Sequence, residues 1–132
     1  MKQITKDWLT AAEDDLLAAK TLSNKTRLTN LVSFHCQQCL EKCFKAIIEE
    51  QDKPSIKSHD LIRLQLNANI KLSVSETILL SIINEVYIDA RYPGDLGLLP
   101  HGKPTIPESE AFIEFCDTIF NRLRDQLVVS NR

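Results

Sequence analysis

The chain has 132 residues, of which 43% are hydrophobic and 26% charged, a length and composition that suit one domain with a hydrophobic core. Its formal net charge of -2 excludes a global basic field that would hold a long polyanion. The chain shows neither an apolar run of membrane-spanning length nor a signal-peptide stretch, so we expect a single cytoplasmic domain over residues 1–132 that avoids membranes.

Apolar residues at helical spacing predict a first helix over residues 5–22 and a longer second helix over residues 28–50. Asp15 falls beside the apolar stripe of the first helix, where an unpaired carboxylate would be costly. We therefore expect it to be the partner of a buried cation or of a backbone amide, and the candidate cations are Arg91, Lys42 and Lys45.

The second helix is apolar around most of its circumference, which places it at the centre of the fold or against a second subunit. A homodimer is therefore predicted, and the candidate contact residues are Phe34, Phe44 and Ile48. The polar strip left on this helix consists of Gln38, Lys42, Lys45 and Glu49. Its amide and its two ammonium groups could face a phosphate, or the strip could be a solvated surface.

Three cysteines of this helix, Cys36, Cys39 and Cys43, share its apolar stripe, and the fourth is Cys116. A metal site would combine Cys36 and Cys39 with His35 or Cys116. A single helix does not bend three thiolates around one zinc ion, so we interpret the cysteines as core residues and predict no metal.

Two further helices are predicted after Pro54. The first is short and has Ser58 as its N-cap, with His59 and Asp60 in its first turn. His59 is either a structural histidine held by a neighbour or a catalytic acid. The second helix begins at a capping box, Ser73-x-x-Glu76. Its expected core stripe is Leu79, Ile83, Val86 and Ala90 with Ile82 beside it, and its flanking stripe is Leu80, Asn84, Tyr87 and Arg91.

All three glycines and four of the five prolines fall within residues 91–107, which predicts one long, shaped loop. Long loops in compact domains are usually functional or disordered. Arg91, at the start of the loop, could hold a phosphate through its guanidinium. Alternatively, it closes the helix end in an ion pair with Asp89, Asp95 or Glu85. A capping box with proline, Thr105-x-Pro107-Glu108, starts the last helix.

The elements together predict an all-α protein, because the sequence shows no strand pattern and no repeat. Most connections are short, so neighbouring helices should pack antiparallel. The expected architecture is an up-down antiparallel bundle of about five helices, with one long Gly/Pro-rich loop before the last helix.

Four segments, in this order, resemble the HEPN domain family: Trp8-x3-Ala12-x2-Asp15-Leu16-x2-Ala19, Phe34-x3-Gln38-x2-Glu41-Lys42-x2-Lys45-Ala46, Ser58-His59-Asp60-Leu61 and Tyr87-x3-Arg91-Tyr92-Pro93. The resemblance implies a compact helical bundle, often a dimer. In prokaryotes such domains commonly pair with a small nucleotidyltransferase, and in some branches they act as endoribonuclease toxins.

The ribonucleases of this family resemble one another in having an arginine followed, after four to six residues, by a histidine. Here nine residues separate Arg91 from His101, so the sequence departs from that pattern. The turn-forming loop could still fold His101 over Arg91, where the imidazole would act as a base and the guanidinium would stabilise a charged phosphorane.

We therefore expect a module that binds nucleotide or RNA phosphate beside a minimal nucleotidyltransferase partner, in a toxin–antitoxin-like system, without cofactor. The expected ligand-binding residues are Gln38, Lys42, Lys45, Tyr87, Arg91 and Tyr92, with the two tyrosines offering rings for base stacking. One alternative is a metal-independent endoribonuclease with Arg91 and His101 as catalytic residues. The other is a dimeric interaction scaffold without ligand.

Overall fold

The computed structural model describes residues 1–88 and 97–131, apart from the side chains of Tyr87 and Ile88. Within these ranges the chain forms five α-helices and no extended strand. The helices are α1 (Gln3–Leu22), α2 (Thr29–Glu50), α3 (Leu61–Asn67), α4 (Val74–Ile88) and α5 (Ile106–Ser130), and a 3-10 turn, η1 (Thr26–Leu28), precedes α2. The predicted all-α fold of five helices is confirmed.

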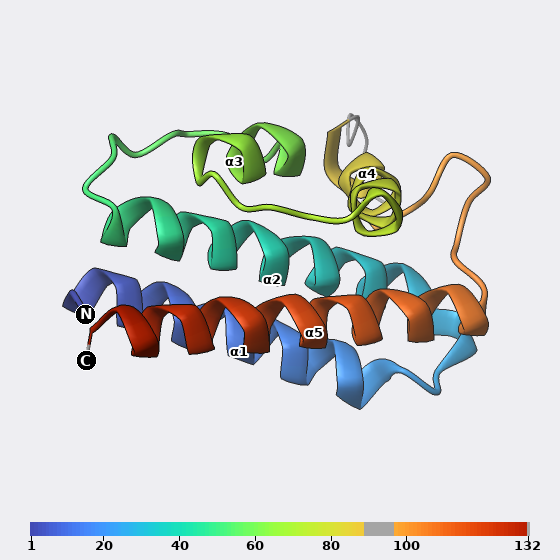
Figure 1. Cartoon of the computed structure of the whole chain (residues 1–132). Coiled ribbons are helices and arrows are strands. Elements are labelled where there is room, and N and C mark those ends of the chain that lie inside the picture. Colours follow the sequence, from blue (N-terminus) through green and yellow to red (C-terminus); the bar gives the residue numbers. More distant parts are fainter. Residues whose placement is uncertain (89–96, 132) are drawn as a thin grey trace.

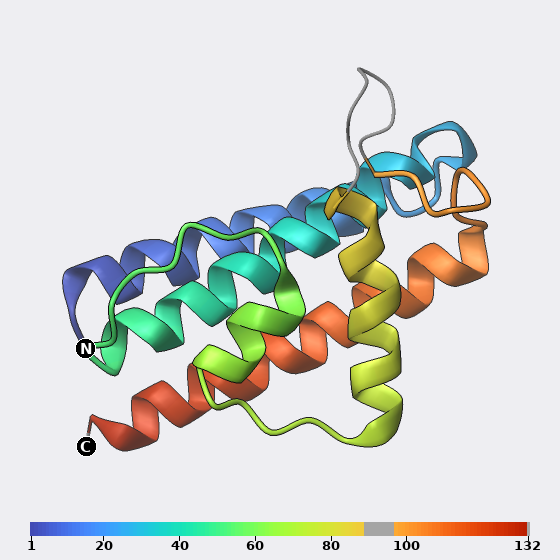
Figure 2. The ribbon, with the colours of Figure 1, turned by 90° about the horizontal axis from the view of Figure 1, so that it is seen from above.

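The three long helices α1, α2 and α5 run alongside one another, and α3 and α4 pack over α2 (Figure 1). α1 and α2 form an antiparallel pair. α5 runs antiparallel to α1 and parallel to α2, so α2 and α5 end at the same end of the bundle. α4 crosses over α2 and α5 instead of running along them, as Figure 2 shows from above. Helix α2 contacts α1, α3, α4 and α5, so it is the central element that the sequence predicts.

Enclosure by four helices buries both apolar sides of α2 within one chain. Phe44 is 0% exposed and Ile48 is 2% exposed, while Phe34 is partly exposed. The expectation that Phe44 and Ile48 lie free for a second subunit is therefore wrong, because the short helices α3 and α4 cover α2 more completely than its apolar pattern alone indicates.

The four cysteines are completely buried in the core, as the sequence predicts. The thiol of Cys116 donates to the backbone oxygen of Cys36 at 3.5 Å, which links α5 to α2. Burial raises the pKa of the Cys116 thiol well above its usual range, so this sulfur stays protonated. Residues 1–88 and 97–131 contain no group of three His, Cys, Asp or Glu side chains arranged to hold a metal ion.

The N-terminus of α3 differs from the sequence prediction. Asp60, not Ser58, is the N-cap, and its carboxylate accepts from the backbone N–H groups of Ile62 and Arg63. Asn84 of α4 fixes this choice, since its amide donates to Asp60 at 3.0 Å and accepts from the backbone N–H of Leu61 at 2.7 Å. The cap of α3 is thus set by a residue of another helix.

Helix α4 begins at the predicted capping box, in which the backbone N–H of Ser73 donates to the Glu76 carboxylate and the backbone N–H of Glu76 donates to the Ser73 hydroxyl. Its buried face differs from the predicted stripe. Leu80, Ile83, Asn84 and Val86 are buried, whereas Leu79 is only partly buried and Ile82 is 40% exposed. The helix is apolar on several sides, so its crossing over α2 and α5 decides which side is buried.

Candidate functional site

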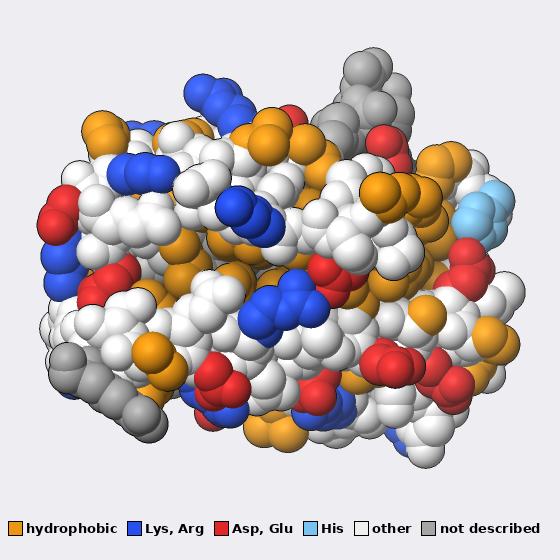
Figure 3. All heavy atoms as spheres, in the orientation of Figure 1, with side chains coloured by type: hydrophobic (Ala, Val, Ile, Leu, Met, Phe, Trp, Pro, Cys, Tyr) orange, Lys and Arg blue, Asp and Glu red, His pale blue; other side chains and the backbone are white. Residues whose placement is uncertain are grey.

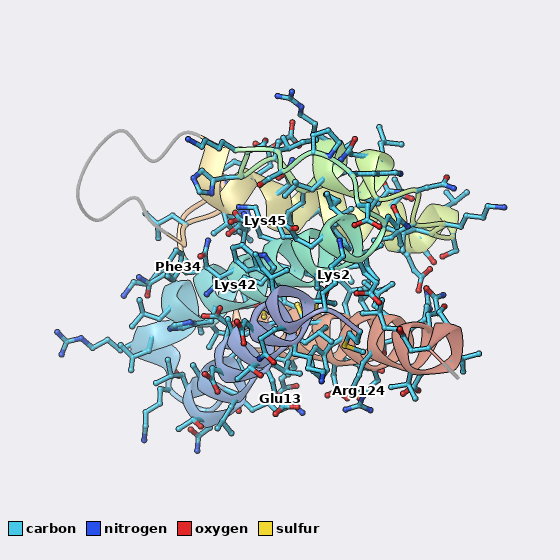
Figure 4. The ribbon with its side chains drawn as sticks, turned by 90° about the vertical axis from the view of Figure 1, so that its left-hand side faces the viewer. Lys2, Glu13, Phe34, Lys42, Lys45 and Arg124 are labelled. Atoms are coloured by element: carbon cyan, nitrogen blue, oxygen red, sulfur yellow. The ribbon has the colours of Figure 1, made fainter. Side chains whose placement is uncertain are left out.

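The middle of α2 reaches the surface along a single narrow strip. Between residues 33 and 48, the only side chains at the surface are Phe34, His35, Gln38, Lys42 and Lys45, each of them partly exposed. Figure 4 labels three of them, Phe34, Lys42 and Lys45, along one side of the helix. We call these five residues the α2 strip. The predicted polar residues Gln38, Lys42 and Lys45 therefore reach the surface, and the α2 strip is the part of the helix between residues 33 and 48 that a ligand can touch.

Beneath one part of the strip lies the Asp15 carboxylate of α1. It accepts from Lys42 Nζ at 2.6 Å and lies 2.8 Å from His35 Nδ1, so one buried carboxylate holds two strip residues. The side chain of Lys42 remains 24% exposed. Of the expected cations that the structure describes, Lys42 is the one that pairs with Asp15, whereas Lys45 pairs with Glu41 and Arg91 lies outside the described residues. An otherwise costly buried charge is satisfied by two charge-assisted contacts.

A second buried carboxylate, Glu41, repeats this arrangement further along the strip. It accepts from Lys45 Nζ at 3.0 Å and lies 2.8 Å from His59 Nδ1, where His59 belongs to the segment that leads into α3. Lys45 also lies over the ring of Trp8 of α1, 5.5 Å from its centroid. The ring of His59 is thus oriented by a neighbour, which fits the structural interpretation of this residue.

The Gly/Pro-rich segment returns to the strip at Gly97. A Cβ placed at Gly97 would lie 1.9 Å from the backbone oxygen of Asn30 and 3.3 Å from Cβ of Phe34, so only glycine allows this approach to α2. The φ of Gly97 is +81°, a value that also favours glycine. The hydroxyl of Ser33 donates to the Gly97 oxygen. The first described residue after position 96 is therefore packed against the beginning of the α2 strip.

After Gly97 the chain makes a tight turn, in which the backbone groups of Leu99 and Gly102 exchange two hydrogen bonds of 2.8 Å. His101 is exposed in this turn, and its Nε2 lies 3.4 Å from Glu108, the carboxylate of the capping box that starts α5. The capping box itself is as predicted.

The structure brings three of the predicted ligand-binding residues, Gln38, Lys42 and Lys45, onto one strip. Arg91 and Tyr92 lie outside the described residues, and so does the side chain of Tyr87, whose backbone is in the last turn of α4. The predicted pairing of Arg91 with His101 is therefore not tested. Sequence reasoning missed the involvement of His35 and Glu41, although their positions beside Gln38 and Lys42 on α2 were the signal that could have found them.

In the part of the chain that the structure describes, no helix is both long and apolar enough to cross a membrane. The central helix, the helices that cover it and the two buried carboxylates beneath the α2 strip define a small all-α bundle with paired polar side chains along the exposed side of α2.

The chain belongs to the HEPN domain family, whose model matches residues 5–126. The crystal structure of TT1696 from Thermus thermophilus is similar with a TM-score of 0.74 and 17% identity, over 94% of this chain and 98% of that one. ST0689, an archaeal HEPN homologue, is similar with a TM-score of 0.70 and 24% identity, over 96% of this chain and 98% of that one. At these identities the two structures show the fold alone. A comparison with curated proteins gives no match.

Proposed function

We propose that this HEPN protein is a binding module for the phosphate groups of a nucleotide or RNA, which it contacts through the α2 strip and the adjoining segment that contains Arg91. The observation that carries the proposal is the approach of Gly97 to the beginning of α2, where the hydroxyl of Ser33 donates to the Gly97 oxygen and a Cβ on Gly97 would come within 3.3 Å of Cβ of Phe34. Phe34 begins the exposed side of the central helix, and Gln38, Lys42 and Lys45 continue it. Gly97, six positions after Arg91 in the sequence, therefore lies at the beginning of the side of α2 that carries the two ammonium groups.

The strip suits a phosphate because its cations are held in place before a ligand arrives. Lys42 and Lys45 are fixed by the buried carboxylates Asp15 and Glu41, so ordering them costs little entropy on binding. These carboxylates also offset the two positive charges, which limits the strength of a phosphate contact. We therefore expect weak, salt-sensitive binding in which Arg91 supplies the largest single contribution.

We further propose that the protein works beside a minimal nucleotidyltransferase in a toxin–antitoxin-like system. This part of the proposal is supported by the four segments through which the sequence resembles the HEPN family. It is tested by co-expression with a nucleotidyltransferase encoded beside its gene. A stable complex that co-elutes in gel filtration is the expected result, and separate elution at micromolar concentration would contradict it.

Phosphate binding is tested by fluorescence anisotropy with a labelled single-stranded RNA of about 12 nucleotides, with AMP and ATP as competitors. Wild type should bind, and Arg91→Ala should abolish binding. Lys42→Ala should weaken binding less and reduce the slope of log K against log salt by about 0.7, the value for one phosphate contact on a single strand. Thermal melting of each variant shows whether it is folded.

Lys20→Ala is the matched control, because it removes the same charge from α1, where Lys20 pairs with Asp117 of α5 away from the strip. It should leave the affinity and the salt slope unchanged. An equal loss for Lys20→Ala and Lys42→Ala would mean that binding is non-specific and would contradict the proposed site. Absence of binding by wild type would favour the interaction scaffold. Cleavage of the RNA in the presence of a chelator, lost in both Arg91→Ala and His101→Ala, would favour the endoribonuclease.

A further inference from the structure

His35 and Lys42, two residues of the α2 strip, share the buried Asp15 carboxylate, and each contacts a different oxygen of it. His35 Nδ1 lies 2.8 Å from Oδ1, and Lys42 Nζ lies 2.6 Å from Oδ2. The ring of His35 also meets the ring of Phe34 edge-on, with 5.4 Å between the two centroids. Two contacts therefore hold the imidazole in place, two helical turns from Lys42 on the same side of α2.

The contact with Asp15 decides which ring nitrogen of the neutral His35 carries the proton. An ionised carboxylate only accepts hydrogen bonds, so Nδ1 donates and Nε2 carries the lone pair. Within the described part of the chain Nε2 has no hydrogen-bond partner, and the side chain is 27% exposed. A phosphodiester oxygen is an acceptor as well. It forms a hydrogen bond with Nε2 only when this nitrogen gains a proton.

Protonation of His35 also changes the charge that a phosphate meets. While the imidazole is neutral, Asp15 cancels the charge of Lys42, and the three side chains together are neutral. The rest of the surface does not compensate, since the formal net charge of the chain is -2. On the face formed by α3, α4 and α5, the basic and acidic side chains are interspersed instead of gathered into a cationic patch (Figure 3). A protonated His35 therefore adds the positive charge that this part of the strip lacks.

We propose that phosphate binding at the α2 strip is coupled to the uptake of a proton by His35, which then donates from Nε2 to a phosphodiester oxygen beside Lys42. This inference rests on the proposed phosphate site and adds its regulation. Two groups of opposite charge face the imidazole, Asp15 from α1 and Lys42 from α2, so the phosphate anion shifts the balance towards the protonated ring. Because the bound state holds one more proton, binding strengthens as the pH falls through the range in which histidine changes charge.

The test uses an oligouridylate of about 12 nucleotides without a terminal phosphate, because neither its phosphodiesters nor its bases change charge between about pH 6 and about pH 8. Wild type should bind it about tenfold more tightly at the lower of these pH values than at the higher one. Calorimetric titration near neutral pH in two buffers of different ionisation enthalpy should show the uptake of about one proton on binding.

Two variants assign the proton to His35. His35→Gln should abolish both the proton uptake and the pH dependence, and should bind about tenfold more weakly than wild type at about pH 6. His35→Lys carries a permanent charge, so its affinity at about pH 8 should match that of wild type at about pH 6. A residue needed only for folding would not be replaced in this way by lysine, and thermal melting shows whether each variant is folded.

The outcomes separate this inference from the proposed phosphate site. Equal affinity of wild type at both pH values would overturn the coupling and leave the site in place. The same conclusion would follow if the proton uptake persisted in His35→Gln and disappeared in His59→Gln or His101→Gln. Absence of oligouridylate binding at either pH would contradict the phosphate site itself, and the coupling with it.

Discussion

Lys42 Nζ lies 2.6 Å from the carboxylate of Asp15, and this contact joins the central helix α2 to α1. Asp15 is 8% exposed and Lys42 is only partly exposed, so water hydrates both charges poorly. Removing one of them would leave the other poorly hydrated and without its ion-pair partner. We predict that Asp15→Asn lowers the free energy of unfolding by about 2 kcal/mol, because Lys42 and His35 lose their shared acceptor charge. Urea unfolding followed by circular dichroism measures the difference.

The same pair predicts a rescue. Adding Lys42→Met to Asp15→Asn should recover part of the lost stability, because no unpaired half-buried charge remains and the methionine stem fills the space of the lysine stem. The free energy of unfolding of the double variant should therefore be higher than the value expected from adding the losses of the two single variants. If the two single losses simply add, Asp15 and Lys42 are not coupled and the contact contributes nothing to folding.

Two glycines of the loop before α5 provide a matched comparison. Gly97→Ala should cost about 3 kcal/mol, since its Cβ would overlap the backbone oxygen of Asn30 in addition to the strain of a positive φ. Gly102 has a φ of +103° but nothing within 4 Å of a Cβ, so Gly102→Ala should cost only about 1 kcal/mol. Thermal or urea unfolding compares them, and equal losses would contradict the close packing of Gly97 on α2.

The ion pair between Glu76 and Arg122 predicts a loss of stability in acid. Hydrogen bonding to Arg122 lowers the pKa of Glu76 from 4.5 to about 2 in the folded protein. The stabilising effect of the Glu76 charge is therefore fully present above 4.5, the pKa of this carboxyl in the unfolded chain, and is lost as the pH falls through about 2. Because the pair is partly exposed, we expect an effect of only about 1 kcal/mol at neutral pH.

Glu76→Gln isolates this charge, because glutamine keeps the capping box with Ser73. The variant should be less stable than wild type at neutral pH. The free energies of unfolding of the two proteins should converge as the pH approaches the pKa of Glu76 in the folded protein. Unfolding curves at several pH values measure the gap between them. A gap that stays constant down to acid pH would mean that the carboxylate charge of Glu76 is not its cause.

The cysteine cluster predicts a protein without bound zinc. Its thiols are buried among apolar side chains of α2 and α5, and burial favours the protonated form of Cys116, which does not bind metal. Elemental analysis after dialysis should find less than stoichiometric zinc. Stoichiometric zinc that disappears in a Cys36→Ser, Cys39→Ser variant would show that the interpretation is wrong.

Three residues of the α2 strip, Gln38, Lys42 and Lys45, could be predicted from the sequence because helical spacing alone aligns them. The need of Asp15 for a partner was also predictable, but the sequence could not choose between Lys42 and Lys45, and the packing of α1 on α2 brings Lys42 to it. Local periodicity gives the faces of a helix, whereas the contacts between helices decide which of several suitable partners is near.

Two errors have the same origin. Ser58 and Asp60 are both good N-caps, and the choice between them depends on Asn84, which is distant in sequence. Helix α4 is apolar on several sides, so its periodicity could not show that Leu80 is buried and Ile82 exposed. The crossing of α4 over α2 and α5 decides this, and no pattern within α4 encodes that crossing.

Backbone amide NMR during titration of the uniformly labelled protein with AMP and with single-stranded RNA tests phosphate binding at the α2 strip directly. The shift changes should concentrate on the α2 strip from Phe34 to Lys45 and on residues 97–103, and Arg91→Ala should remove them. Changes confined to the outer surface of α1 and α5 near Lys20 and Asp117, or none at millimolar ligand, would contradict phosphate binding at the strip.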